Sequence, residues 1–242
     1  MWANIFRPDN VQLAVDVVKT ILLENIWETF YMTVLSTIIA YVIGLPLGVL
    51  LVVGEKDGIR PIPSGAMHVI NVVVNLLRSV PFLILMITVL PLSEVLLGTS
   101  VGTRAVIPPL IIASFPYVAR LVESSIRDVD KGIIEAAQSM GATPNQIIWK
   151  VMIPESMPSL VSGFTIALTT ILGYGAMAGI IGGGGLGMIA ITYGYYRYKA
   201  LVMLIAVVLL VVMVQVFQSV GTHLAIRCDK RIKLIKKRRK KG

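Results

Sequence analysis

Long apolar runs without a charged side chain alternate with short polar segments along this chain. Three of these runs contain no Asp, Glu, Lys or Arg, and they cover residues 29–53, 159–181 and 200–226. About 20 apolar residues in a helix cross a hydrocarbon core about 30 Å thick, and a helix satisfies its own backbone hydrogen bonds there. The pattern therefore predicts three membrane-spanning helices.

Two further apolar segments are interrupted by polar residues. The first, 105–122, begins after Arg104 and is expected to continue as a polar helix into the cytoplasm. The second, 65–97, is too long for one upright span and carries a break near 78–81, so it forms either one kinked span or a hairpin of two. The distribution of Lys and Arg fits five and six spans equally well. We predict five spans and an outside N-terminus, because a hairpin turn at 78–81 would be very short.

Composition supports a single all-α integral membrane domain over residues 1–242. Hydrophobic residues make up 56% of the chain and charged residues only 14%, which is too apolar for a soluble domain. The net charge is +9, and ten of the 22 basic residues lie in the tail 227–242, mostly in the run Lys236–Lys241. Basic residues directly after a span attract anionic lipid. We therefore expect a cytoplasmic tail whose partner is membrane lipid and not nucleic acid.

Glycine and proline punctuate the polar loop 123–158. Gly141 suits a left-handed helix end, and Thr143 followed by Pro144 suits an N-cap and a first helical position. A second helix is expected to begin there and to end at Pro154. The loop is thus predicted to hold two short cytoplasmic helices joined at a sharp angle. The alternative is an ordinary helical hairpin without function.

The first of these helices has the features of a docking surface. Ala136 and Ala137 have small side chains that let a partner approach the backbone, and Glu135 offers a charged contact beside them.

The sequence lacks the groups that an enzyme needs. We find no catalytic constellation and no metal-ligand cluster, since the two histidines, His68 and His223, are far apart. The glycine run 182–185 is not followed by the Gly-Lys-Ser/Thr of a phosphate-binding loop. The chain is therefore predicted to be no enzyme and to hold no cofactor.

Several residues near the predicted breaks are candidates for a solute pathway or gate. An arginine at membrane depth usually faces protein or water, although Arg78 could instead reach the inner interface. Tyr117 and Met177 lie near likely bends, with lipid or core packing as the alternative for each. Small residues allow both close helix packing and bending. The candidate set is Arg78, Ser79, Pro81, Tyr117, Gly173, Gly175 and Met177.

The spacing of the loop motif resembles the cytoplasmic signature of ATP-binding-cassette (ABC) importer permeases. Three residues separate Glu135-Ala136-Ala137 from Gly141, and nine more lead to Val151-Met152-Ile153-Pro154. Val151 and Ile153 are conservative departures from the family pattern. Beyond the loop, most of the chain after residue 25 resembles the permease subunit of methionine importers. The segments that carry this likeness are 27–33, 78–85, 98–102, 116–120, 141–144 and 193–195, whereas residues from 200 onward match only in hydropathy.

This resemblance implies a type I ABC importer architecture with five transmembrane helices per subunit. It implies a homodimer in a bacterial cytoplasmic membrane, two cytoplasmic ATPase subunits that bind ATP and Mg²⁺, and an extracellular binding protein that delivers methionine or a close analogue. The positions implied to contact the ATPase are Glu135, Ala136, Ala137, Gly141 and Pro154. The open alternatives are a permease for another amino acid, a phosphonate or a small organic solute, and a membrane scaffold that transports nothing.

Overall fold

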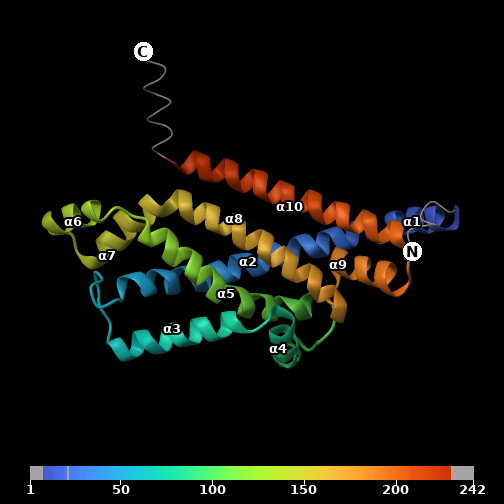
Figure 1. Ribbon diagram of the computed structural model, residues 1–242, viewed down its shortest axis with the longest axis horizontal. Coiled ribbons are helices and arrows are strands. Elements are labelled where there is room, and N and C mark those ends of the chain that lie inside the picture. Colours follow the sequence, from blue (N-terminus) through green and yellow to red (C-terminus); the bar gives the residue numbers. More distant parts are fainter. Residues whose placement is uncertain (1–7, 21, 230–242) are drawn as a thin grey trace, which may run out of the picture. The chain divides into compact units, whose positions relative to one another are not determined.

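The computed structural model describes residues 8–20 and 22–229, and within these ranges the chain is helical with no β-strand. The predicted all-α fold is therefore confirmed. The α-helices, in chain order, are α1 (Pro8–Thr20), α2 (Leu22–Val53), α3 (Ser64–Ser79), α4 (Phe82–Leu97), α5 (Thr103–Arg127), α6 (Lys131–Ser139), α7 (Pro144–Ile147), α8 (Ile153–Ala178), α9 (Gly185–Ile189) and α10 (Ala200–Cys228) (Figure 1).

Short tighter or wider turns connect some of these helices. The π-helical turns cover Ile148–Met152 and Ala190–Tyr196, and a 3₁₀ turn covers Gly179–Ile181.

Four stretches of the described chain are long and apolar enough to cross a membrane: Leu22–Val53, Thr103–Arg127, Pro144–Ile181 and Ala200–Cys228. A fifth results if α3 and α4 count as one broken span. This count agrees with the prediction of five spans.

The break between α3 and α4 lies where the sequence placed it. Helix α3 ends at Ser79, and Pro81 stands before the first residue of α4 with φ −56° and ψ 135°. A proline has no N–H to donate, and it disfavours helical backbone in the residue before it. The residue pair 80–81 therefore interrupts the helical hydrogen bonding inside an apolar segment.

The described chain forms two compact units, and four long helices contribute to both. Unit 1 contains the residues up to Ala40, Val80–Ser114 and Leu168–Phe217, and unit 2 contains Tyr41–Ser79, Phe115–Ala167 and the residues from Gln218 onward. In unit 1, α1 buries Ala14 and Val17 in a cluster with Leu186 of α9 and Val202 of α10. The first helix is thus packed into unit 1 through one face.

Glycines bring α2 and α5 close together in unit 2. A Cβ atom on Gly44 would lie 2.6 Å from Val118 Cγ1, and one on Gly48 would lie 2.6 Å from Val122 Cβ. Real Cβ atoms do not approach other atoms so closely. Small residues four positions apart are the usual means by which membrane helices approach each other, so this pair fixes the packing of α2 on α5.

The basic tail is only partly described. Helix α10 ends at Cys228, and the predicted lipid-binding run Lys236–Lys241 lies outside the described residues.

Candidate functional site

Helix α6 carries the first part of the predicted docking loop, and its two ends are fixed locally. Asp130 caps its start, where the side chain Oδ1 accepts a hydrogen bond from the Gly132 N–H at 2.7 Å. After its end, Gly141 has φ +77° and donates its N–H to the Gln138 carbonyl at 2.9 Å. The left-handed backbone favours glycine because an L side chain would be strained there. The predicted role of Gly141 as a helix end is confirmed.

Helix α7 begins as the sequence predicted. Thr143 and Gln146 form a reciprocal capping box, in which the Thr143 N–H donates to Gln146 Oε1 at 2.9 Å and the Gln146 N–H donates to Thr143 Oγ1 at 3.4 Å. Pro144 occupies the first turn, where its missing N–H costs nothing. The sharp connection between α6 and α7 is therefore set by residues 141–146 (Figure 1).

The predicted end of this second helix at Pro154 is wrong. The helical path continues from α7 through the π-helical turn Ile148–Met152 into α8, and Pro154 is the second residue of α8. The Ile153 N–H donates to the Ile148 carbonyl, five residues back. A π turn is wider than an α turn, so it accommodates a proline, which cannot make the usual hydrogen bond four residues back.

The docking loop exposes large apolar side chains that the sequence reasoning did not single out. Met140 is 81% exposed and Trp149 is 65% exposed, while Glu135 and Ala136 are also exposed on α6. Ala137 is only 5% exposed, so its small side chain packs within unit 2, and Pro154 is half-buried. A partner that docks on this loop would bury the apolar side chains of Met140 and Trp149. In the sequence, Met140 and Trp149 can be recognised only as isolated large apolar residues within a polar loop.

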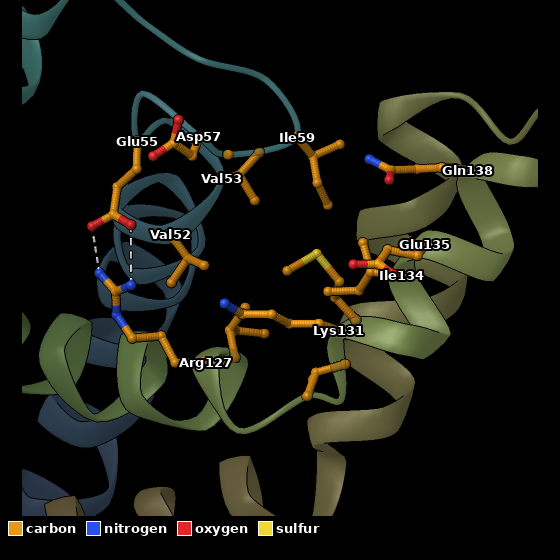
Figure 2. A pocket seen from close by; sticks show the side chains of 14 residues that line it. Val52, Val53, Glu55, Asp57, Ile59, Arg127, Lys131, Ile134, Glu135 and Gln138 are labelled. Atoms are coloured by element: carbon orange, nitrogen blue, oxygen red, sulfur yellow. Dashed lines mark hydrogen bonds and ion pairs between the residues drawn. The ribbon is translucent and has the colours of Figure 1, made fainter.

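A cavity of about 590 Å³ lies against α6 in unit 2. Figure 2 shows its walls, in which Glu135, Ile134 and Gln138 of α6 face Val53 and neighbouring residues after α2. The full lining is Val52, Val53, Glu55, Asp57, Gly58, Ile59, Ile126, Arg127, Val129, Lys131, Ile134, Glu135, Gln138 and Met152. Glu135, a predicted contact residue, therefore lines the same cavity as residues of α2 and α5.

An ion pair closes one side of this cavity. Arg127 donates from Nη1 to Glu55 Oε2 at 3.0 Å and from Nη2 to Glu55 Oε1 at 2.5 Å (Figure 2). These hydrogen bonds from the guanidinium favour the charged carboxylate and hold the pKa of Glu55 below its usual value. The bidentate geometry fixes the start of the α2–α3 connection to the end of α5.

The predicted pathway residues are divided between the units. Arg78 and Ser79 are exposed at the end of α3 in unit 2, where Tyr117 is half-buried in α5. Pro81 in unit 1 precedes Phe82, whose ring stacks on that of Tyr174 in α8 at 4.4 Å between centroids. The sequence did not reveal this aromatic contact, because Phe82 and Tyr174 are 92 residues apart and no local pattern connects them.

The other predicted pathway residues lie in the unit 1 part of α8. A Cβ atom on Gly175 would lie 2.8 Å from Met32 Cε, whereas one on Gly173 would meet no atom of the described residues within 4 Å. Met177 is 48% exposed. Gly175 is thus closely packed against the end of Met32, and Gly173, Gly175 and Met177 all remain pathway predictions.

The glycine run 182–185 is held by residues of α2 and α5. The N–H of Gly185 donates to Glu28 Oε2 at 2.8 Å, and the N–H of Leu186 donates to Thr29 Oγ1 at 2.8 Å. Gly182, Gly184 and Gly185 all have positive φ. A Cβ atom on Gly183 would lie 2.7 Å from Val106 Cγ2. Both backbone conformation and close packing therefore require glycine here.

The sequence is similar to transport permeases over most of its length. Residues 62–229 match the family described as the binding-protein-dependent transport system inner membrane component. A probable D-methionine transport system permease of Vibrio cholerae is 46% identical over 212 residues, which cover 87% of this chain and 93% of that protein. The methionine import system permease of Bacillus subtilis is 48% identical over 163 residues, which cover 67% and 73% of the two chains.

A solved structure agrees with these relatives. The fold superposes on a chain of an inward-facing methionine ABC transporter with a TM-score of 0.84 and 42% identity, covering 86% of this chain and 96% of the other. An amino acid ABC transporter with 21% identity shares the fold with a TM-score of 0.66. With a family match over more than half of its length, this chain belongs to the inner membrane components of binding-protein-dependent transport systems, and it is a transport permease rather than an enzyme.

Proposed function

We propose that this chain is the permease subunit of an ATP-driven importer for methionine or close analogues. The observation that carries the proposal is the identity of 46% over 87% of the chain with a permease named for D-methionine transport. The likeness to an inward-facing methionine ABC transporter supports the same assignment.

The proposed transporter contains two copies of this chain, two ATPase subunits and an external binding protein. The ATPase subunits supply the bound ATP and Mg²⁺, because this sequence has no Gly-Lys-Ser/Thr phosphate-binding motif. The complex lies in a bacterial cytoplasmic membrane, with the loop 123–158 and the C-terminus on the cytoplasmic side. Anionic lipid contacts the tail.

The loop of α6 and α7 is the proposed contact with the ATPase. Glu135 and Ala136 present a charged group and a small side chain, and Met140 and Trp149 add apolar surface that this contact would bury. Binding energy that differs between the two ATPase states shifts the permease between outward-open and inward-open forms. This difference drives alternating access.

Uptake of labelled methionine tests the proposal. Cells that lack this chain are supplied with the wild type, and energy-dependent uptake is measured with and without unlabelled competitors. Restored uptake that unlabelled methionine abolishes is the expected result. If another amino acid or a phosphonate competes and methionine does not, the substrate assignment is wrong. Restored uptake without any external binding protein would contradict the importer mechanism.

A further inference from the structure

A buried carboxylate on α5 joins two arginines of the same helix. Glu123 Oε2 accepts from Arg120 Nη1 at 2.6 Å, and Glu123 Oε1 accepts from Arg127 Nη2 at 2.8 Å. The Glu123 side chain is only 12% exposed. The three positions lie on one face of the helix, since they are three and four residues apart. Glu123 therefore holds both guanidinium groups in defined positions.

Arg120 extends this arrangement to α3. Its Nη2 donates to Asn71 Oδ1 at 2.8 Å and to Asn75 Oδ1 at 2.9 Å. The amide nitrogen of Asn71 donates to the Met67 carbonyl at 3.0 Å, which leaves its oxygen directed at the guanidinium. Arg120 of α5 is thus hydrogen-bonded to two successive turns of α3.

The hydrogen-bonded chain continues to the end of α3. Ser79 Oγ donates to the Asn75 carbonyl at 2.8 Å. Arg78 precedes this serine, and both are predicted pathway residues. At the opposite end of the chain, Arg127 binds Glu55 in the wall of the cavity that Glu135 also lines. Within unit 2, a set of hydrogen bonds therefore runs from Glu55, in the wall of the cavity that Glu135 also lines, to the end of α3.

The charges in this set balance. Two guanidinium groups face two carboxylates, and the asparagines supply further acceptors for Arg120. Removing Glu123 would leave both arginines without their shared and largely buried carboxylate, whereas the more exposed pair of Arg127 with Glu55 contributes less. Elements held in this way move together.

We infer that Arg120, Glu123, Asn71 and Asn75 are positioning residues that carry the movement of the docking loop to α3. This inference rests on the proposed function, since it assigns a coupling role within that transporter. The link fixes α3 to α5, so a shift of α5 imposed by the ATPase displaces Arg78 and Ser79 as well. Without the link, ATP hydrolysis continues while α3 no longer follows.

The test replaces both asparagines in the complete transporter with its ATPase and binding protein in liposomes. Asn71→Leu with Asn75→Leu removes the acceptors at similar volume, Asn71→Gln with Asn75→Gln retains uncharged amide acceptors, and His68→Leu is an exposed control on α3. The leucine variant is expected to transport at least about fivefold fewer molecules per ATP hydrolysed. The glutamine variant and the control keep the wild-type ratio.

A distance measurement decides the same question without any substrate. Spin labels on Val72→Cys and Ser124→Cys, both exposed positions, with Cys228→Ser, report the separation of α3 and α5 before and after ATP trapping. A constant separation in the wild type and a changed or broadened one in the leucine variant is expected. An unchanged ratio and separation in the leucine variant would overturn the link, as would equal losses of uptake and hydrolysis. Failure of wild-type methionine uptake would refute only the proposed substrate.

Discussion

Replacing Gly141 by valine tests the connection between α6 and α7 most directly. Among the residues that the structure describes, no atom lies within 4 Å of a Cβ atom built at this position, but the backbone has φ +77°. The cost is therefore conformational and not steric. An L residue in the left-handed region loses about 1–2 kcal/mol, which is a factor of about 5–30 in a two-state ratio. Valine is at the upper end because its side chain is branched at Cβ.

Two glycines provide matched controls for this substitution. Gly98 has φ +71°, and within the described part of the chain a Cβ atom there would also meet no atom within 4 Å, so Gly98→Val introduces the same backbone strain at the end of α4. Gly65 has open space and no positive φ, so Gly65→Val introduces neither effect. Asparagine tolerates the left-handed region, and Gly141→Asn should retain function.

The assay measures methionine uptake and ATP hydrolysis in the reconstituted transporter, together with thermal unfolding. Gly141→Val and Gly98→Val are expected to lose similar stability, and only Gly141→Val to transport fewer molecules per ATP. Equal coupling in these two variants would refute the reasoning. Normal coupled transport by Gly141→Val would show that the junction geometry is not needed.

Three further predictions concern unit 2. Gly48→Val should lower the stability of the protein by about 1–3 kcal/mol through overpacking against Val122, as measured by thermal unfolding in detergent, and a stability equal to wild type would contradict the close approach of α2 and α5. Trp149→Ala should weaken ATPase binding in a pull-down without changing the unfolding temperature of the isolated permease, and unaltered binding would exclude this side chain from the contact. The pKa of Glu55 is lowered in the folded protein, so its pair with Arg127 stabilises the fold fully above the ordinary glutamate pKa of 4.5 and progressively less as the pH falls through the lower folded-state value. Because both side chains are over 40% exposed, this stabilisation is at most about 1 kcal/mol. Glu55→Gln should abolish this pH dependence of the unfolding temperature.

Local signals in the sequence were sufficient for the helices and the start of the docking loop. Apolar runs indicated where the long helices lie. Gly141 indicated a helix end and Thr143 an N-cap, because both features depend only on residues nearby in the sequence. Pro154 was misread because a single proline does not reveal the π turn that accommodates it. Contacts between distant positions left no such pattern. Arg127 and Glu55 are 72 residues apart, and their pairing follows only from the packing of α5 beside the end of α2.

The capping of α9 has a consequence for the biogenesis of this protein. Glu28 and Thr29 accept hydrogen bonds from Gly185 and Leu186, which follow them by 157 residues. During synthesis α2 enters the membrane long before α9 exists, and the first amides of α9 find these partners only when most of the chain has left the ribosome. The contact therefore belongs to a later step of assembly than the synthesis of α2. Chains stopped before residue 185 lack both donors, so Glu28 and Thr29 of α2 cannot form these two hydrogen bonds in them.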